Sequence, residues 1–444
     1  MGTRRALLQA GMVLPLTAAC APDLLLGSSE AVRVGVSWSG SELAAFHAVL
    51  DGLEVAFDVE VIPLGDNTDT AFTAGGRSAP DVVLLPQAGR VRELARRGEL
   101  RPIPETVWTD RSGARYAQHW QLLLRHEGRA FGVPFKAADK SLVWFDRQQF
   151  ATYGLGDPTG WTLPDWVDRM EVLAQSPIRL LALAAADGWV LTDFFENVLL
   201  AESPRFYDEL ASKNRREWDN PAVRAALKHL GILWGHRHAF PGGVGVALTR
   251  QFSDAVRDVF QHRRAAAVVA PDFAEPIVRS GVRASGRQVP DVVGVVPFPA
   301  VTPASGRPKI VGGDVLVVTH EANRRAEDLV EKLAGARAPL PWIERYGGFL
   351  APNLRTEAEY SPLLASSARE LNARSAFDLS DRIGAVGGRA GLWRALTEFL
   401  IAIGDGAPTP VAEATDRAIA ALHDFERPPR CPGSSATAAS SPRT

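Results

Sequence analysis

Short apolar strands alternate with amphipathic helices along this chain, and that alternation limits its possible folds more than any other feature. Residues 32–37 carry valine at every second position before the pattern breaks. The run PDVVLLPQ, residues 80–87, is apolar without interruption, which is typical of a strand buried on both faces. Helical spacing follows each run, and further strand-like runs occupy residues 54–63, 140–146, 265–270, 291–299 and 312–318. This order predicts an α/β protein built on parallel strands.

The middle of the chain is predominantly helical. Residues 193–200 and 221–235 have helical patterns, as do residues 391–425 near the end, and strand-like runs lie on both sides of the first two. A chain of 444 residues is also too long for one ordinary hydrophobic core. We therefore expect two α/β lobes, between which the chain crosses more than once.

The stretch VRVGVSWSGSELAAFHAVL joins the first strand to the first helix. Ser39, followed three residues later by Glu42, predicts a capping box at the helix N-terminus. Trp38 lies at the join, where we expect an exposed indole. Two interpretations of Trp38 stay open. It is either a core aromatic at a strand end or a platform for a ligand, because α/β sheets bind ligands beyond the carboxyl ends of their strands.

The first residues have the pattern of an export signal. Two arginines precede a charge-free segment, residues 6–19, which ends in small residues before Cys20. This segment is shorter than the ~20 residues needed to span a bilayer. LTAAC resembles a bacterial lipobox, and TRRALL resembles a twin-arginine export motif. These resemblances imply a signal peptide over residues 1–19 and a lipid on Cys20 that anchors the protein to the cell membrane. The alternative is an ordinary secretory peptide with an incidental cysteine.

The composition argues against nucleic acid as a partner and predicts a disordered C-terminal tail. The formal net charge of −2 and the pI near 6.5 provide no basic footprint for nucleic acid. Residues 428–444 are rich in Pro, Ser and Ala, so we expect a disordered tail, and we assign no function to Cys431 within it. With only two cysteines, an exported protein of this length must be held together by its core.

Three blocks of the sequence, taken in order, resemble one known family. They are GRSAPDVVLLPQAGRVRELARRGELRPI, then GRAFGVPFKAADKSLVWFDRQQFATYGLGDPTGWTLPDWVDRM, then VGGDVLVVTHEANRRAEDLVEKLAG with RYGGFLAPN. Their order and spacing are similar to those of the extracytoplasmic solute-binding proteins of bacterial carbohydrate ABC importers, the family 1 proteins that include maltose-binding protein. The resemblance covers the mature chain. It implies a two-lobed periplasmic-binding-protein type II fold, with a hinge and an interlobe cleft that closes on a ligand.

The resemblance also implies lobe boundaries and partners. Residues 31–140 and 305–375 would form the first lobe, and residues 141–304 and 376–427 a second, helix-rich lobe. The expected ligand is a sugar or oligosaccharide of glucoside type, and the expected protein partners are the membrane subunits of an ABC permease. We expect a monomer without a cofactor or a metal.

A sugar site needs aromatic faces for C–H surfaces and a few convergent polar groups for hydroxyls. In the first lobe and at the crossing, the resemblance and the local patterns assign ligand contacts to Trp38, Ser39, Glu42, Gln87, Lys140, Ser141, Gly313 and Asp314. In the second lobe they assign Asp187, Trp189, Asp272, Phe273 and Trp393. Thr192 is expected to cap the helix that follows Trp189. For several of these residues a structural role stays open as the alternative to ligand contact. Glu42 could cap a helix, Gln87 could belong to a turn and Lys140 could lie on a solvated edge. Trp189 and Trp393 could pack in the core.

Other functional classes find less support in the sequence. The catalytic patterns G-x-S-x-G and H-E-x-x-H and the P-loop do not occur, so we expect no enzymatic activity. Two alternatives to a sugar receptor stay open. One is a receptor of the same fold for a glycerophosphodiester, a polyamine or iron. The other is a lipid-anchored adaptor that binds no small molecule, against which the exposed tryptophans expected at 38 and 189 would argue.

Overall fold

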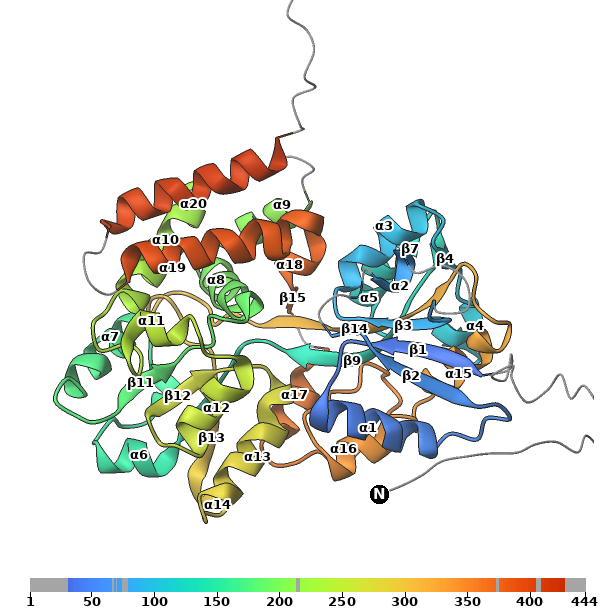
Figure 1. Cartoon of the computed structure of the whole chain (residues 1–444), viewed down its shortest axis with the longest axis horizontal. Coiled ribbons are helices and arrows are strands. Elements are labelled where there is room, and N and C mark those ends of the chain that lie inside the picture. Colours follow the sequence, from blue (N-terminus) through green and yellow to red (C-terminus); the bar gives the residue numbers. More distant parts are fainter. Residues whose placement is uncertain are drawn as a thin grey trace, which may run out of the picture.

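A computed structural model describes residues 31–427, apart from 66, 67, 69, 74–78, 213–215, 373–374 and 405–408. The predicted signal peptide with Cys20 and the predicted tail with Cys431 lie outside the described residues. The described chain forms two lobes, each organised around its own β-sheet (Figure 1). The predicted two-lobed α/β architecture is therefore confirmed.

The first lobe contains a seven-stranded sheet in the order β15-β14-β3-β1-β2, with β4 and β9 also paired to β14. Its strands are β1 (Val32–Val36), β2 (Val59–Pro63), β3 (Val82–Leu85), β4 (Leu100–Arg101), β9 (Val133–Asp139), β14 (Ile310–Thr319) and β15 (Ala376–Phe377). Strands β1, β2 and β3 are parallel, as predicted, but β14 runs antiparallel to β3 and β9. The sheet is mixed because β14 enters it from the side of the second lobe.

Burial accounts for the strand patterns in this sheet. Every residue of β3 and of the ten-residue β14 is buried, which explains their continuous apolar runs. β2 lies at the edge of the sheet and is half-exposed. Only the second half of the predicted strand at residues 54–63 therefore joins the sheet. Two small hairpins complete the strands of this lobe: β5 (Thr109–Asp110) with β6 (Gly113–Ala114), and β7 (Arg125–His126) with β8 (Arg129–Ala130).

Helices cover the first sheet, and α17 lies between the lobes (Figure 1). They are α1 (Gly40–Asp51), α2 (Thr70–Thr73), α3 (Val91–Arg96), α4 (Glu105–Trp108), α5 (Gln118–Leu124), α15 (Arg325–Leu333), α16 (Leu340–Arg345) and α17 (Ala365–Glu370). Helices α1 and α16 pack against each other, and α15 packs on β1 and β14. This packing places the N-terminal turn of α1 next to the carboxyl end of β1.

The second lobe contains a four-stranded sheet in the order β11-β12-β10-β13. Its strands are β10 (Leu142–Asp146), β11 (Arg179–Ala182), β12 (Ala265–Val269) and β13 (Val293–Pro297). Its helices are α6 (Arg147–Thr152), α7 (Leu163–Val172), α8 (Gly188–Glu202), α9 (Pro204–Ser212), α10 (Pro221–Trp234), α11 (Gly243–Ala247), α12 (Phe252–Phe260), α13 (Glu275–Ala284), α14 (Val289–Val292), α18 (Leu379–Arg382), α19 (Arg394–Ile403) and α20 (Val411–Glu426). Within the described ranges, no helix combines the length and the apolarity that crossing a bilayer requires.

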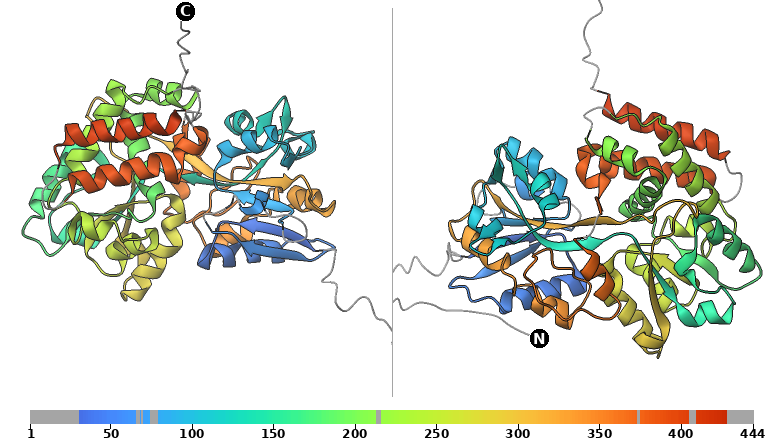
Figure 2. Two further views of the ribbon diagram at one scale, coloured as in Figure 1. Left: turned by 45° about the horizontal axis from the view of Figure 1, so that its top comes forward. Right: turned by 180° about the vertical axis from the view of Figure 1, so that it is seen from behind.

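The chain passes between the two sheets three times. It leaves the first sheet after β9 and enters β10, returns from β13 to β14, and leaves again after β15 (Figures 1 and 2). These three segments form the hinge between the lobes. Strands β9 and β14 are paired along much of their length, so the crossing that leaves β9 and the crossing that reaches β14 are attached to the same two-stranded unit.

Two predicted helix caps are wrong. Ser39 is the N-cap residue of α1, but its side chain makes no capping hydrogen bond, and Glu42 instead forms an ion pair with Lys136 of β9. Helix α8 begins at Gly188, so Thr192 lies inside it and donates its hydroxyl to the carbonyl of Trp189. In the first case a tertiary ion pair outcompetes the local cap. In the second, the threonine hydroxyl is satisfied by the preceding helical turn.

Candidate functional site

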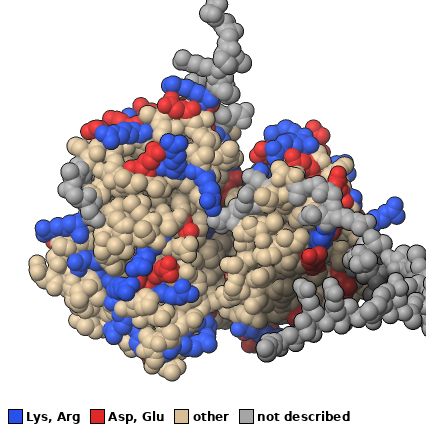
Figure 3. All heavy atoms as spheres, in the orientation of Figure 1, with Lys and Arg blue, Asp and Glu red and all other residues tan. Residues whose placement is uncertain are grey.

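The two lobes meet through a chain of aromatic and charged contacts. Lys136, on β9 of the first lobe, holds its Nζ 5.1 Å from the ring centre of Phe273, in the second lobe. The same atom lies 5.9 Å from the ring centre of Trp38 and 5.0 Å from that of Trp342. On the face shown in Figure 3, the lobes touch along a seam that is hollowed at its upper end. We call the residues around Lys136, together with Trp189 and Trp393, the interlobe site.

Trp38 is buried, so the predicted exposed indole is wrong. Only 5% of its surface is open, and its ring packs edge-on against Phe46 and Trp342, with ring centres 5.2 and 4.9 Å away. The indole nevertheless lies at the end of β1, where it forms one wall around the Lys136 ammonium. Trp38 is thus both a core aromatic and part of the interlobe site.

Lys136 carries a buried positive charge in the middle of β9, between apolar neighbours. Its residue surface is 1% exposed, its ammonium pairs with Glu42, and Asp272 and Asp314 lie nearby. Burial opposes the charged form, but attraction by these three carboxylates raises the pKa of Lys136 above its usual value. The charge is therefore retained, between aromatic rings that favour a cation at their faces.

The second lobe contributes an aromatic surface. Trp189, in the first turn of α8, has its ring centre 5.0 Å from that of Phe252 and 5.9 Å from that of Phe273. All eleven tryptophans of the chain are described, and among them only Trp189 and Trp393 keep part of their surface open. A Cβ added to Gly188 would come within 2.8 Å of the Trp393 Cβ, so the two tryptophans flank Gly188.

A second group of charges, the hinge cluster, surrounds Lys140. The Nζ of Lys140 pairs with Asp193 of α8 at 3.2 Å and with Asp378, which follows β15. Glu196 and Asp381 complete the cluster, and burial, followed by repulsion from Asp378, raises the pKa of both carboxyl groups well above the usual values. Lys140 thus joins two of the three crossings to the second lobe. Its prediction as a ligand contact stays untested.

Four buried carboxylate oxygens accept no hydrogen bond within the described part of the chain. One is Oε2 of Glu99 in the first lobe; the other three are Oδ2 of Asp193, of Asp272 and of Asp381. The other oxygen of Asp272 accepts the backbone N–H of Asp139 across the lobes, at 2.7 Å. A buried acceptor without a donor is costly, so these oxygens favour a ligand that donates hydrogen bonds. Metal binding is a poorer fit, since no group of three potential ligands among the described residues is arranged to hold an ion.

Gly313 lets three strands approach each other at the site. Its φ of +146° is rarely adopted by other residues, and a Cβ there would lie 2.1 Å from the carbonyl oxygen of Lys136. It also forms a β-bridge with Gln87, at the end of β3. Asp314 follows directly and is 9% exposed. The assignment of Gly313 and Asp314 as ligand contacts stays a prediction.

The remaining predicted residues have structural roles in this structure. Ser39 is exposed, and Asp187 accepts the backbone N–H of Phe252 at 2.6 Å. Ser141 is buried, donates its hydroxyl to Asn197 at 2.5 Å and accepts the N–H of Ile310 at 2.9 Å. Their assignment as ligand contacts stays a prediction.

Sequence reasoning missed three contributors to the site: Lys136, Trp342 and Asp193. A signal was present for two of them. Lys136 interrupts the apolar run VPFKAAD, and Asp193 lies with Glu196 on a helix that is otherwise mainly apolar. A charge within a buried run usually means a partner or a function. Trp342 had no comparable signal, because an aromatic residue on a helix is most often part of a core.

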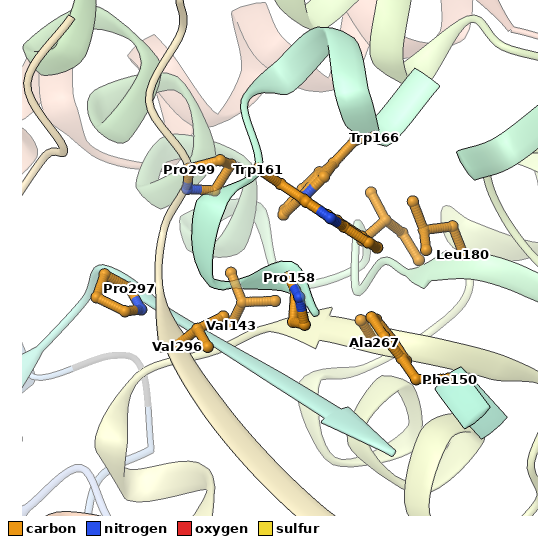
Figure 4. Close-up of a pocket in the computed structure, with 11 residues that line it drawn as sticks. Val143, Phe150, Pro158, Trp161, Trp166, Leu180, Ala267, Val296, Pro297 and Pro299 are labelled. Carbon is orange, nitrogen blue, oxygen red and sulfur yellow. The ribbon is translucent and has the colours of Figure 1, made fainter. Parts of the chain in front are cut away.

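An apolar pocket in the second lobe is unsuited to a sugar. Figure 4 shows Trp161 and Trp166 over Val143 and Phe150, with prolines closing the other sides. All eleven lining residues are apolar. A sugar placed there would leave its hydroxyls without partners, at a cost of ~1–3 kcal/mol for each group. The pocket is therefore a packing feature of the lobe, and the interlobe site remains the candidate.

We expect the free energy of unfolding to decrease as the pH rises from 6.5 to 8. Burial raises the pKa of Asp193, Asp272 and Asp314 to about 7 in each case, against the opposing pull of a neighbouring lysine. A carboxyl group whose pKa is raised by folding stabilises the fold while protonated, and that contribution is lost as the pH passes through about 7. Urea unfolding at several pH values measures this slope.

The control for this prediction is the variant Asp272→Asn with Asp314→Asn, which should flatten the slope. Burial lowers the pKa of His119. A histidine whose pKa is lowered by folding makes the free energy of unfolding increase with pH, but only at pH values below its usual pKa, which lie outside this window. A slope unchanged in the double variant would contradict the assignment.

In sequence, the chain is similar to several solute-binding proteins. It is 27% identical over 336 residues to the osmoprotective compounds-binding protein GgtB of Synechocystis sp., covering 72% of this chain and 76% of GgtB. It is 27% identical over 244 residues to the alpha-glucosides-binding periplasmic protein AglE of Rhizobium meliloti, covering 50% of this chain and 51% of AglE. An uncharacterized ABC transporter extracellular-binding protein of Pyrococcus horikoshii is 24% identical over 195 residues, 42% of this chain and 45% of that protein. No family model matches the chain.

Structure comparison agrees on the fold. The bacterial solute receptor AcbH superimposes with a TM-score of 0.72 at 18% identity, covering 89% of this chain and 99% of AcbH. An ABC transporter solute-binding protein from Thermotoga lettingae gives a TM-score of 0.69 at 17% identity, covering 90% of this chain and all of that chain (100%). The chain is thus a homologue of the extracellular solute-binding proteins of ABC transporters and has their two-lobed fold.

Proposed function

We propose that this protein captures a sugar or oligosaccharide between its lobes outside the cytoplasm and delivers it to the membrane subunits of an ABC permease. One observation carries the proposal. Two tryptophans remain partly open: Trp189, whose ring packs on Phe273, and Trp393, whose side chain lies against Gly188, and both are near a junction lined with buried carboxylates. Aromatic faces for C–H surfaces and acceptors for hydroxyls are the two requirements of a sugar site.

The ligand class follows from the acceptors and from the relatives. The unpaired oxygens of Asp193, Asp272 and Asp381 suit a ligand with several hydroxyl donors. The named ligands of the relatives, osmoprotective compounds for GgtB and alpha-glucosides for AglE, include glucosides. We therefore place a glucoside-type compound first. A phosphodiester is disfavoured, because the described carboxylates would repel its phosphate.

Binding without chemical conversion is part of the proposal. The carboxyl groups of the interlobe site are engaged by Lys136 and by backbone N–H groups, which suits ligand orientation. Incubation of the protein with a chromogenic glycoside should release no chromophore. An adaptor that binds no small molecule is the second candidate, and the partly open Trp189 and Trp393 argue against it.

Attachment to the membrane through Cys20 is also proposed, on the sequence LTAAC alone. Mass spectrometry of the protein from a membrane fraction should show a diacylglyceryl cysteine at the mature N-terminus. Cys20→Ser should release the protein from the membrane fraction, and retention of that variant would exclude the lipid anchor.

Replacement of Trp189 by alanine should weaken sugar binding about 10-fold to 100-fold, because a stacked ring of this size contributes ~1.5–3 kcal/mol. A thermal-shift screen of the protein against mono- and disaccharides, glycerophosphodiesters and polyamines identifies the ligand first. Calorimetric titration of the variant then measures the loss of affinity.

Trp161→Ala is the matched control for this experiment. It removes the same ring from the same lobe, but within the apolar pocket of Figure 4, so stability should fall while affinity is kept. Unchanged affinity in both Trp189→Ala and Trp38→Ala would refute the placement of the ligand. If no compound of the panel shifted the unfolding temperature, the adaptor would be favoured.

A further inference from the structure

A second hollow lies at the hinge, apart from the interlobe site. Its cavity of about 470 Å³ is bounded by two of the crossing segments, near Asp139 and Lys309, by β13 and by α17. This volume falls within the range of small-molecule sites. The geometry points to a second binding site here, for a small organic anion that carries carboxylate or phosphate groups.

The cavity and the hinge cluster lie on opposite faces of the same crossing segment. Successive residues of an extended chain point to opposite sides. Accordingly, Asp139 lines the cavity and pairs with Lys309, whereas Lys140 points away and pairs with Asp193. Figures 1 and 2 show α17 between the lobes, near the strands that cross from one lobe to the other. A ligand in the cavity would therefore lie across this segment from the hinge cluster, and no residue that lines the cavity belongs to the interlobe site as defined around Lys136.

The charges that line the cavity favour an anion. Asp139 is neutralised, because it pairs with Lys309 and its other oxygen accepts the N–H of Ser141 at 3.2 Å. Arg147 and Arg307 remain, and within the described residues neither forms an ion pair with a carboxylate. The guanidinium of Arg307 donates only to the carbonyl of Thr159. Guanidinium groups bind carboxylates and phosphates through paired hydrogen bonds.

The other wall, formed by α17, limits how the anion can lie. Glu370 accepts the hydroxyl of Ser366 at 2.9 Å and would repel a negative group. The anionic group must therefore face Arg147 and Arg307, while the rest of the ligand meets Pro362, Leu363 and the hydroxyl of Ser367. The site suits a compact molecule with oxyanion groups at one end.

Occupancy of this cavity should influence ligand capture. Its walls come from both lobes, and its floor consists of the segments about which the lobes rotate. A ligand that contacts both walls binds one opening angle better than others, and it shifts the population of lobe arrangements accordingly. By thermodynamic reciprocity, a ligand in the interlobe site then changes the affinity for the anion by the same factor.

Isothermal titration of the whole soluble protein with citrate, and separately with inorganic phosphate, tests the proposal. Chloride at the same ionic strength serves as the blank. We expect saturable binding of at least one probe. Tighter binding of citrate would indicate a ligand with carboxylate groups, and tighter binding of phosphate would indicate a ligand with phosphate groups. The double variant Arg147→Ala with Arg307→Ala should bind about tenfold more weakly or worse.

The matched control removes two arginines that lie elsewhere on the second lobe. Arg205 and Arg394 are exposed and pair only with carboxylates one helical turn away, so Arg205→Ala with Arg394→Ala should keep full affinity. Circular dichroism verifies that both double variants are folded. Absence of saturable binding for both probes would overturn the proposal, as would equal affinity in the two double variants.

Discussion

Lys140→Met should lower the free energy of unfolding by ~3–5 kcal/mol, a loss typical of removing one partner from a buried ion pair. The ammonium of Lys140 pairs with Asp193 and Asp378, which are 95% or more buried, and Glu196 and Asp381 lie close by. Without the lysine, these carboxyl groups must either stay charged in a poorly solvated place or take up protons. Chemical denaturation at pH 8 measures the loss.

The pH dependence of this loss distinguishes the mechanism. Proton uptake relieves the unpaired charges, so the difference from the wild type should shrink at pH 6. Adding Asp378→Asn should restore part of the stability, because a buried pair removed from both sides leaves less uncompensated charge. Lys332→Met is the matched control: Lys332 is exposed on α15, and its loss should cost less than ~0.5 kcal/mol. A loss that is equal at both pH values would contradict the electrostatic explanation.

Gly313→Ala should lower the free energy of unfolding by ~3 kcal/mol or more, since it combines backbone strain with overpacking. The added Cβ would lie 2.1 Å from the carbonyl oxygen of Lys136 and 2.8 Å from the Cα of Ala137. Both are backbone atoms of β9, whose pairing with β14 holds them in place. The φ of +146° adds strain of its own for any residue with a side chain.

The same substitution should weaken ligand capture, because β9 carries Lys136 and β14 carries Asp314. Thermal unfolding and calorimetric titration report the two effects separately. Gly306→Ala is the control: a Cβ at this position would have no atom within 4 Å, and the φ of Gly306 is not positive, so both properties should match the wild type. A Gly313→Ala protein as stable as the Gly306→Ala protein would show that β9 and β14 can separate locally without cost.

Much of the fold could be predicted because its signals are local. Continuous apolar runs identify β3 and β14, and helical spacing identifies α8 and α10, without knowledge of what each element contacts. The direction of β14 could not be predicted in this way. Whether a strand runs parallel or antiparallel depends on the end from which the chain enters the sheet, and here it enters from another lobe.

The candidate site was predictable only where a residue stands out from its own surroundings. Trp189, beside Gly188 near a helix start, has such a signal, and it is one of the two partly open tryptophans. The partners of Lys136 come instead from α1, from the short 3-10 helix η5 (Asp272–Ala274) and from β14, which no spacing along the chain connects. The local sequence pattern also gave a wrong interpretation of Glu42. A glutamate at this position fits a capping box, but it fits an ion pair with a distant residue equally well.

The position of β14 in the first sheet has a consequence for the order in which the protein folds. Strands β1 to β3 emerge first, yet the central strand that pairs with β3 is made only after the complete second sheet. The four strands of the second sheet are contiguous in the chain and can therefore pair first, although helices α18 to α20 of that lobe are made last. Until β14 is made, the edge of β3 stays open to wrong partners. We expect assembly of the first lobe to be the slow step, and the one in which a chaperone that shields exposed strand edges has its effect.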